Sequence, residues 1–293
     1  IPSFIVDPVV VDELSDVARY AGHPLFHRTS IFHALNQKAV AKRYAKEHGR
    51  KYEDLNLIVC HMGGGCSIGA HVQGSVVDTQ NALDGDGPFS PERSGSLPTG
   101  QLVKQCFSGK YTEGEMHRML SGRGGLVAYT GSNDMRDLLK AAAEGDKEIA
   151  ATVEAFHYQI GKEVGAMAAV MKGKVDQIIL TGGIAYGQET VDAITDMVGW
   201  IAPITVYPGE DELLASCYRS CLLLAAENGC KTVDFPSIST GVYHFPLDRA
   251  AKIAISTIIA VTAAHPEIER VRMVCFDSRT KQAYENALRE VRG

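Results

Sequence analysis

Histidine and arginine residues lie next to glycine-rich turns in the first part of this sequence. His61 ends an apolar run and is followed at once by the glycines 63–65, while Arg93 and Glu92 lie in a loop rich in glycine, proline and serine. Backbone N–H groups at such turns can bind phosphate. A positive or hydrogen-donating histidine and a guanidinium beside them can stabilise a phosphoryl group during its transfer. The residue types therefore indicate phosphate chemistry.

Each of these residues also has a purely structural interpretation. His61 is equally compatible with a hydrogen-bonded histidine in the core, and Arg93 with a surface ion pair to Glu92 of little energetic weight. Asp7 lies just before Pro8 and can simply begin a turn, and His33 is open to the same two interpretations. The residues alone leave both interpretations open.

Further glycine turns occur at 122–125 and at Gly182-Gly183, the latter directly after an apolar run. Glycine makes up 29 of the 293 residues, which exceeds the usual ~7%. The sequence contains no G-x-x-x-x-G-K-[ST], which excludes a P-loop enzyme. The glycines 63–65 also do not form the G-x-G-x-x-G turn of a dinucleotide-binding domain.

Strand and helix patterns alternate along the chain, which predicts an α/β fold to position these turns. The segment 10–21 reads as a helix. The main expected strands are 56–62, 66–72, 74–79, 176–181, 204–207, 231–235 and 270–276. The other main expected helices are 31–49, 147–172, 187–199, 211–228, 246–264 and 279–290.

Composition limits the class of protein. The net charge of −6 argues against a nucleic-acid binder that relies on a basic surface, and no uncharged apolar run reaches the length of a membrane span. The seven cysteines show no C-x-x-C spacing and several lie in apolar runs, so we expect buried thiols in a reducing cytoplasm. No signal peptide pattern is present. Because residue 1 is Ile, we expect the sequence to come from a longer one.

Six ordered runs in this sequence resemble the butyrate kinases of the acetate kinase family, within the sugar kinase/Hsp70/actin superfamily. The resemblance covers residues 1–215 and implies a ribonuclease H-like (actin-like ATPase) fold. It also implies phosphoryl transfer from ATP, with Mg²⁺, to a short-chain carboxylate of the butyrate type, and a homo-oligomer. The runs are residues 4–14, 30–41, 61–71, 81–95, 180–186 and 207–215.

The same resemblance implies roles for individual residues. Arg93 would lie near the carboxylate and the transferring phosphoryl, His33 would contact the phosphoryl, and Asp7 and His61 would complete the catalytic set. The implied nucleotide-binding turns are Gly63, Gly64 and Gly65, and Gly182 and Gly183; the implied metal ligands are Asp211 and Glu212. The family's N-terminal phosphate turn has no match here, so we expect an N-terminally truncated kinase region whose isolated activity is low or absent.

Residues 216–293 resemble the C-terminal half of a macro domain, which implies a partial α/β segment that binds ADP-ribose. The loop implied to hold the diphosphate is Ser239, Thr240, Gly241, Val242 and Tyr243. The sequence therefore predicts two domains, 1–215 and 216–293. Three hypotheses follow: a carboxylate kinase, an ADP-ribose-binding module, or a non-functional chimera of the two.

Overall fold

The computed structural model describes residues 7–208, 210–240 and 245–292. The chain divides into two compact units, Ile1–Pro208 and Gly209–Gly293. The predicted domain boundary at 215/216 falls inside helix α8 (Glu210–Glu227). A helix packs as one hydrogen-bonded rod, so all of α8 belongs to the second unit. The division between the two compact units therefore lies before residue 215, where the resemblance to the kinase ends.

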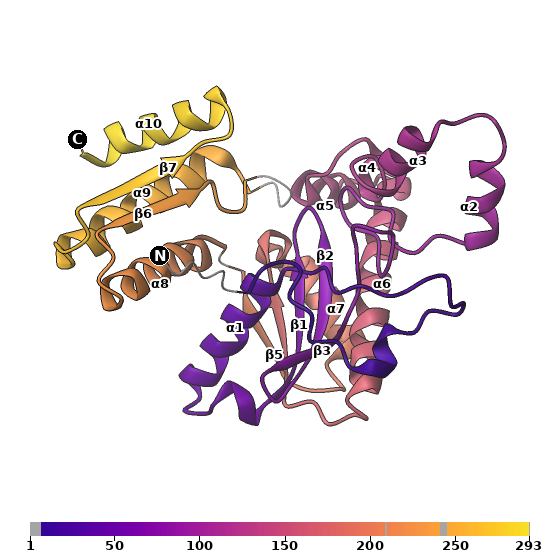
Figure 1. The fold of residues 1–293 in the computed structure, drawn as a ribbon. Helices are drawn as coiled ribbons and strands as arrows, with labels where there is room; N and C mark the ends of the chain where they lie inside the picture. The colour runs from indigo at the N-terminus through magenta and orange to yellow at the C-terminus, as the bar shows by residue number, and fades with distance from the viewer. Residues whose placement is uncertain (1–6, 209, 241–244, 293) are drawn as a thin grey trace. The chain divides into compact units, whose positions relative to one another are not determined.

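The first unit is built on a five-stranded sheet with strand order β3-β2-β1-β4-β5 (Figure 1). Strands β1, β4 and β5 are parallel, whereas β2 pairs antiparallel with both β1 and β3. The mixed sheet therefore brings the carboxyl ends of three strands to one edge. The strands are β1 (Asn56–Met62), β2 (Cys66–Val72), β3 (Ser75–Thr79), β4 (Gln177–Thr181) and β5 (Ile204–Tyr207).

Side chains of β1 alternate between two buried faces, as the strand repeat of two requires. Ile58, Cys60 and Met62 join the main core with Phe156 and Ile160 of α6 (Lys147–Val170). The alternate residues, including His61, lie on the opposite face, where α1 (Ala34–Glu47) packs against β1. His61 therefore belongs to the α1 face of the sheet.

Shorter helices complete the first unit, and some of them pack against α6. Helices α5 and α7 both pack against α6, and α4 contacts it as well. Their bounds are α2 (Thr99–Cys106), α3 (Glu113–Leu120), α4 (Leu126–Thr130), α5 (Met135–Ala143) and α7 (Gln188–Val198), with short 3₁₀ turns η1 (Asp16–Arg19), η2 (Tyr52–Asp54) and η3 (Gly183–Tyr186).

The helix expected at 10–21 is absent, and only η1 forms there. The run Val9–Val11 consists of β-branched residues, which lower helix propensity. Hydrogen bonds to residues far along the chain hold this segment in place. One of them joins Ser15 N to the Val77 carbonyl oxygen at 2.9 Å. Local periodicity overestimated its helical character.

Within its described residues, the second unit combines two parallel strands, β6 (Thr232–Pro236) and β7 (Arg270–Val274), with three helices. Helix α9 (Leu247–Ala264) packs against both α8 and α10 (Ser278–Arg292). The second unit has an apolar core of its own, which includes Tyr218, Leu222 and Phe235. None of the helices in the described part of the chain combines the length and apolar character that a bilayer crossing needs.

Candidate functional site

Two glycine turns follow neighbouring parallel strands of the first unit. In the β1–β4 register His61 pairs with Thr181, so the glycines 63–65 and Gly182-Gly183 emerge at the same edge of the sheet. Carboxyl ends of parallel strands are where ligands bind in open α/β sheets. Gly63 and Gly64 are partly exposed, so this edge reaches solvent.

The rings of His33 and His61 stack at this edge, with centroids 3.8 Å apart and planes 18° from parallel. His33 precedes α1 as its N-cap residue, and its carbonyl accepts the first helical bond, from Gln37 N at 2.9 Å. His61 Nδ1 donates to Asn36 Oδ1, also on α1, at 2.9 Å. The start of α1 thus fixes both imidazoles.

Burial keeps both rings neutral near pH 7. It lowers the pKa of His61 to about 3, with a further contribution from the positive charge of Arg93. Burial also lowers the pKa of His33 well below its ordinary value, and the neighbouring His61 and Arg93 act in the same direction. Burial therefore argues against a positively charged His61, while a hydrogen-bonded core histidine and a neutral ring that acts at the site both stay open.

Arg93 is buried, with 7% of its surface exposed, and lies against the first glycine turn. A methyl group on Gly65 would overlap the Arg93 guanidinium, so only glycine at 65 permits this approach. Arg93 O accepts from Ser90 N at 3.0 Å, and Arg93 forms a β-bridge with Ser121. The surface ion pair considered for Arg93 does not describe this buried position.

The glycines at 122–125 support the Arg93 loop. Gly125 has a φ of 64°, and a methyl group there would overlap the Ser90 carbonyl oxygen. Gly122 N donates to the Glu92 carbonyl at 2.8 Å. The turn therefore packs on the backbone of the loop that carries Arg93.

Gly182 joins the ends of β4 and β1. Its φ is 90°, a conformation that side chains other than glycine rarely adopt, and a methyl group on it would overlap the backbone of Met62. Gly183 follows as the first residue of η3. Gly182 thus permits the close approach of two strand ends at the candidate site.

We expect Gly182→Ala to lower the free energy of unfolding by about 2–4 kcal/mol, because the new methyl group is both strained and in conflict with Met62 backbone atoms. Chemical denaturation measures the change. The matched control is Gly100→Ala in α2, where nothing lies within 4 Å of the new group; there we expect unchanged or slightly higher stability. Equal effects of the two variants would contradict this assignment.

Asp7 lies beside α1, where its carboxylate oxygens are 3.6 Å from Lys38 Nζ and 3.6 Å from Lys42 Nζ. Lys38 also pairs with Glu13. Asp7 has a left-handed φ of 42°. The structure thus brings His33, His61 and Arg93 together and gives Asp7 lysine partners on the adjoining helix; its catalytic role stays a prediction.

Sequence reasoning did not single out Ser67, Gln37 or Asn36 as site residues. Ser67 Oγ lies 2.8 Å from His33 Nδ1 and 2.8 Å from Gln37 Nε2. The sequence did contain a pattern that could have indicated them. Ser67 and His71 are polar residues four apart in an apolar strand, so they share one face, and Gln37 lies one helical turn after His33. Such pairing across elements needs the register, which one sequence does not supply.

The predicted ADP-ribose loop is only partly within the described residues. Ser239 has a φ of 65°, and Thr240 Oγ1 lies 2.6 Å from Ser237 Oγ. Gly241, Val242 and Tyr243 lie outside the described residues.

The predicted metal ligands Asp211 and Glu212 belong to α8 in the second unit, and their side chains lie outside what the structure describes. Among the described residues no group of three or more His, Cys, Asp or Glu side chains is arranged to hold a metal ion.

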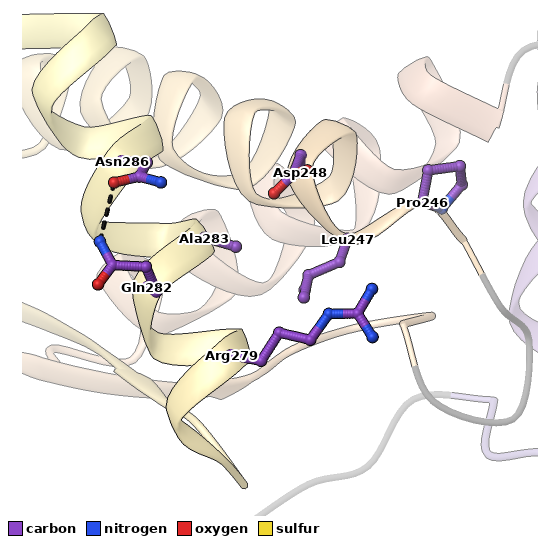
Figure 2. Close-up of a pocket in the computed structure, with 7 residues that line it drawn as sticks. All are labelled: Pro246, Leu247, Asp248, Arg279, Gln282, Ala283 and Asn286. Carbon is purple, nitrogen blue, oxygen red and sulfur yellow. Dashed lines mark hydrogen bonds between the residues drawn. The ribbon is translucent and has the colours of Figure 1, made fainter.

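A shallow pocket of about 460 Å³ opens in the second unit at the starts of α9 and α10 (Figure 2). Figure 2 shows Arg279 beside Leu247, and a hydrogen bond of 2.9 Å joins Gln282 to Asn286. The lining residues are Pro246, Leu247, Asp248, Arg279, Gln282, Ala283 and Asn286. None of the predicted site residues lines it.

Comparison with known proteins identifies relatives of this chain. The model of the acetokinase family matches residues 9–222. A probable butyrate kinase of Clostridium botulinum (strain Eklund 17B / Type B) is 59% identical over 231 residues, and butyrate kinase 2 of Clostridium acetobutylicum is 58% identical over 231 residues. Each match covers 79% of this chain, which spans 65% of the length of these relatives.

Solved structures confirm the predicted kinase fold. Acetate kinase of Porphyromonas gingivalis superposes with a TM-score of 0.63 at 21% identity, covering 71% of this chain and 61% of that one. A propionate kinase of Francisella tularensis gives 0.56 at 26% identity, covering 64% and 50%. A macrodomain of Oceanobacillus iheyensis is 35% identical over 30% of this chain and 52% of that one, but its TM-score of 0.27 is too low to support an inference.

Proposed function

The chain belongs to the acetokinase family, and from this premise we propose that its first unit carries the phosphoryl-transfer site of a carboxylate kinase. The proposed substrates are ATP and a short-chain carboxylate of the butyrate type, and the products are ADP and an acyl phosphate. One observation carries the proposal: buried Arg93 and the stacked His33 and His61 lie together at the edge where two glycine turns emerge. Relatives named butyrate kinases support the choice of acceptor.

The chemistry needs positioning and charge stabilisation rather than a protein nucleophile. A carboxylate oxygen attacks the γ-phosphorus, the new C–O–P link forms, and the bond to the bridging oxygen breaks, so that its electron pair leaves with ADP. The carboxylate is already ionised and requires no general base. Arg93 is suited to neutralise charge on the carboxylate and the equatorial oxygens, and the neutral imidazole of His33 is suited to donate a hydrogen bond to them. The proton of neutral His61 is used toward Asn36, so His61 contributes by stacking on the His33 ring.

The first unit has features that suit a bound nucleotide. A methyl group on Gly64 would meet nothing within 4 Å, so the backbone there is open to close approach. Gly182 holds the neighbouring turn against the end of β1. We propose that Gly63, Gly64 and Gly65 bind phosphate through their backbone and that Gly182 and Gly183 border the adenosine.

The Mg²⁺ that the family implies has no such support from the described residues. They contain no suitable cluster of ligands, and the Asp7 carboxylate is held by Lys38 and Lys42. We therefore derive no step through the ion. Coordination of Mg²⁺ by Asp211 and Glu212 stays a prediction.

Trapping the product tests the proposed function. The protein is incubated with ATP, Mg²⁺, hydroxylamine and one carboxylate at a time, from acetate to hexanoate and including branched acids. Because the N-terminal phosphate turn has no match in this chain, we expect a low rate, but the acyl hydroxamate that forms should be equimolar with ADP, with the highest kcat/KM near four carbons. Formation of AMP instead of ADP, or ADP without hydroxamate, would exclude carboxylate phosphorylation as the reaction.

Other assignments stay predictions. ADP-ribose binding by residues 216–293 lacks a supporting observation, because three of its five loop residues lie outside the described part. Calorimetry with ADP-ribose is its direct test, and absence of heat at millimolar ligand would remove it. A homo-oligomer, a cytoplasmic location and the absence of nucleic-acid partners are likewise expectations from sequence.

A further inference from the structure

Five buried polar side chains form a hydrogen-bonded row on the α1 face of the sheet. Tyr52 OH lies 2.7 Å from His71 Nδ1, and His71 Nε2 lies 3.0 Å from Gln37 Oε1. Gln37 Nε2 lies 2.8 Å from Ser67 Oγ, which lies 2.8 Å from His33 Nδ1. We call these five residues the buried polar row; each is less than a tenth exposed.

The orientation of Gln37 sets the direction of the row. Gln37 Nε2 also lies 3.0 Å from the Ser67 carbonyl oxygen, which can only accept a hydrogen bond. The amide nitrogen must therefore face Ser67, and Oε1 must face His71. Because Oε1 only accepts, His71 carries its proton on Nε2.

His71 is neutral as well, since burial first and the Lys38 charge second lower its pKa to about 3. A neutral imidazole with its proton on Nε2 accepts at Nδ1. The Tyr52 hydroxyl therefore donates to His71, and the row begins with a donor.

Ser67 is the next member of the row and donates its hydroxyl proton to His33. Its Oγ accepts from Gln37 Nε2 at 2.8 Å and from the backbone N of His33 at 3.4 Å, which occupies both lone pairs. The remaining hydroxyl proton lies toward His33 Nδ1. A histidine that accepts at Nδ1 holds its own proton on Nε2.

We infer that Gln37 and Ser67 are positioning residues that hold His33 as the neutral Nε2–H tautomer. Donors aligned in one direction along a buried row strengthen one another. His33 then donates through Nε2, the ring nitrogen remote from Ser67; that this donor serves the transferring phosphoryl rests on the proposed function.

The local sequence makes room for the row. A methyl group on Gly69 would overlap Gln37 Oε1 and lie 3.1 Å from His71 Nε2. Ser67, Gly69 and His71 occur at alternate positions of β2, so all three share the α1 face.

Nitrogen-15 NMR of histidine side chains tests the inference without any assay of activity. The signals of His33 are assigned by their loss in His33→Asn. In the wild type we expect an unprotonated, hydrogen-bonded Nδ1 and a protonated Nε2. A proton on Nδ1 in the wild type would overturn the inference whether or not any variant folds.

Variants of Ser67 then test the source of the preference. In Ser67→Ala we expect His33 to occur as a mixture of tautomers. We expect kcat to fall about ten- to hundred-fold with KM nearly unchanged, a smaller loss in kcat than removal of the hydrogen-bond donor itself causes. Ser67→Thr retains the hydroxyl and should restore both. The matched control is Ser30→Ala, which removes a buried hydroxyl bonded to the Val11 carbonyl, outside the row.

The outcomes separate the two proposals. An unchanged His33 tautomer in folded Ser67→Ala would show that Ser67 does not set it. The expected tautomers together with no acyl phosphate from any carboxylate would remove the proposed function and leave the role of the row intact.

Discussion

Replacement of Arg93 by lysine is expected to lower kcat for acyl phosphate formation by ~10³-fold or more, within the range for an arginine that stabilises a phosphoryl transition state. Lysine keeps the charge but not the planar pair of donors that engages two oxygens at once. Steady-state hydroxamate kinetics measure the loss.

A matched variant separates a local from a general effect. Arg136→Lys changes an exposed arginine whose partner is Asp134 at the start of α5, and we expect its kcat to match the wild type. Circular dichroism establishes that both variants are folded. A folded Arg93→Lys protein with kcat within tenfold of the wild type would contradict the role given to Arg93.

Acid is expected to unfold the first unit steeply, because His33, His61 and His71, three of the four buried histidines in the described residues, have pKa values far below the ordinary one and are neutral in the folded state. The pKa values of His61 and His71 fall to about 3 and that of His33 also falls well below its ordinary value, all chiefly through burial. Above pH 6.5 neither folded nor unfolded chains protonate these rings. Below it only the unfolded chain binds the protons, so stability falls from pH 6.5 down toward pH 3.

The expected slope follows from the number of protons. Each such histidine contributes about 1.4 kcal/mol per pH unit, so the three together approach about 4 kcal/mol per pH unit. Urea unfolding between pH 4 and 7 measures it, followed through Trp200, the sole tryptophan, which lies in the first unit.

Removing one histidine isolates the effect from that of the carboxyl groups. In His71→Gln the slope should drop by about 1.4 kcal/mol per pH unit. His117→Gln, which changes an exposed histidine, is the control and should keep the wild-type slope. A stability that is flat from pH 6.5 to pH 4.5 would contradict neutral burial of the three rings.

Much of the sheet edge that carries the glycine turns was predictable because its signals are local. The apolar run before His61 predicted β1 with the bounds that the structure gives, Asn56–Met62, and the glycines after it predicted a turn. The family resemblance pointed to His33 and Arg93, and the structure places both beside His61. Their catalytic roles remain predictions, since proximity alone does not establish chemistry.

The partners that hold these residues were not predictable in the same way. Ser67 meets His33 across 34 residues of sequence, and Tyr52 meets His71 only because β2 follows β1 in an antiparallel register. Hydrogen bonds of this kind depend on strand register and helix rotation. Neither is encoded in the composition of a short window.

The segment 10–21 shows the opposite error. Its spacing favoured a helix, but long-range bonds such as Ser15 to Val77 hold it in an irregular path with one 3₁₀ turn. Tertiary contacts override a weak local preference. The compact units divide between Pro208 and Gly209, before the continuous helix α8, whereas the boundary at 215/216 rests on the change of motifs and stays a prediction.

The most direct test of the central claim follows an oxygen label from the carboxylate. Butyrate carrying ¹⁸O in both carboxylate positions is incubated with the protein, ATP and Mg²⁺, and the product is cleaved with hydroxylamine, which attacks the acyl carbon. The proposed reaction predicts one ¹⁸O atom in the released inorganic phosphate and none in the nucleotide. Label in AMP, or unlabelled phosphate beside hydroxamate, would contradict phosphoryl transfer to the carboxylate.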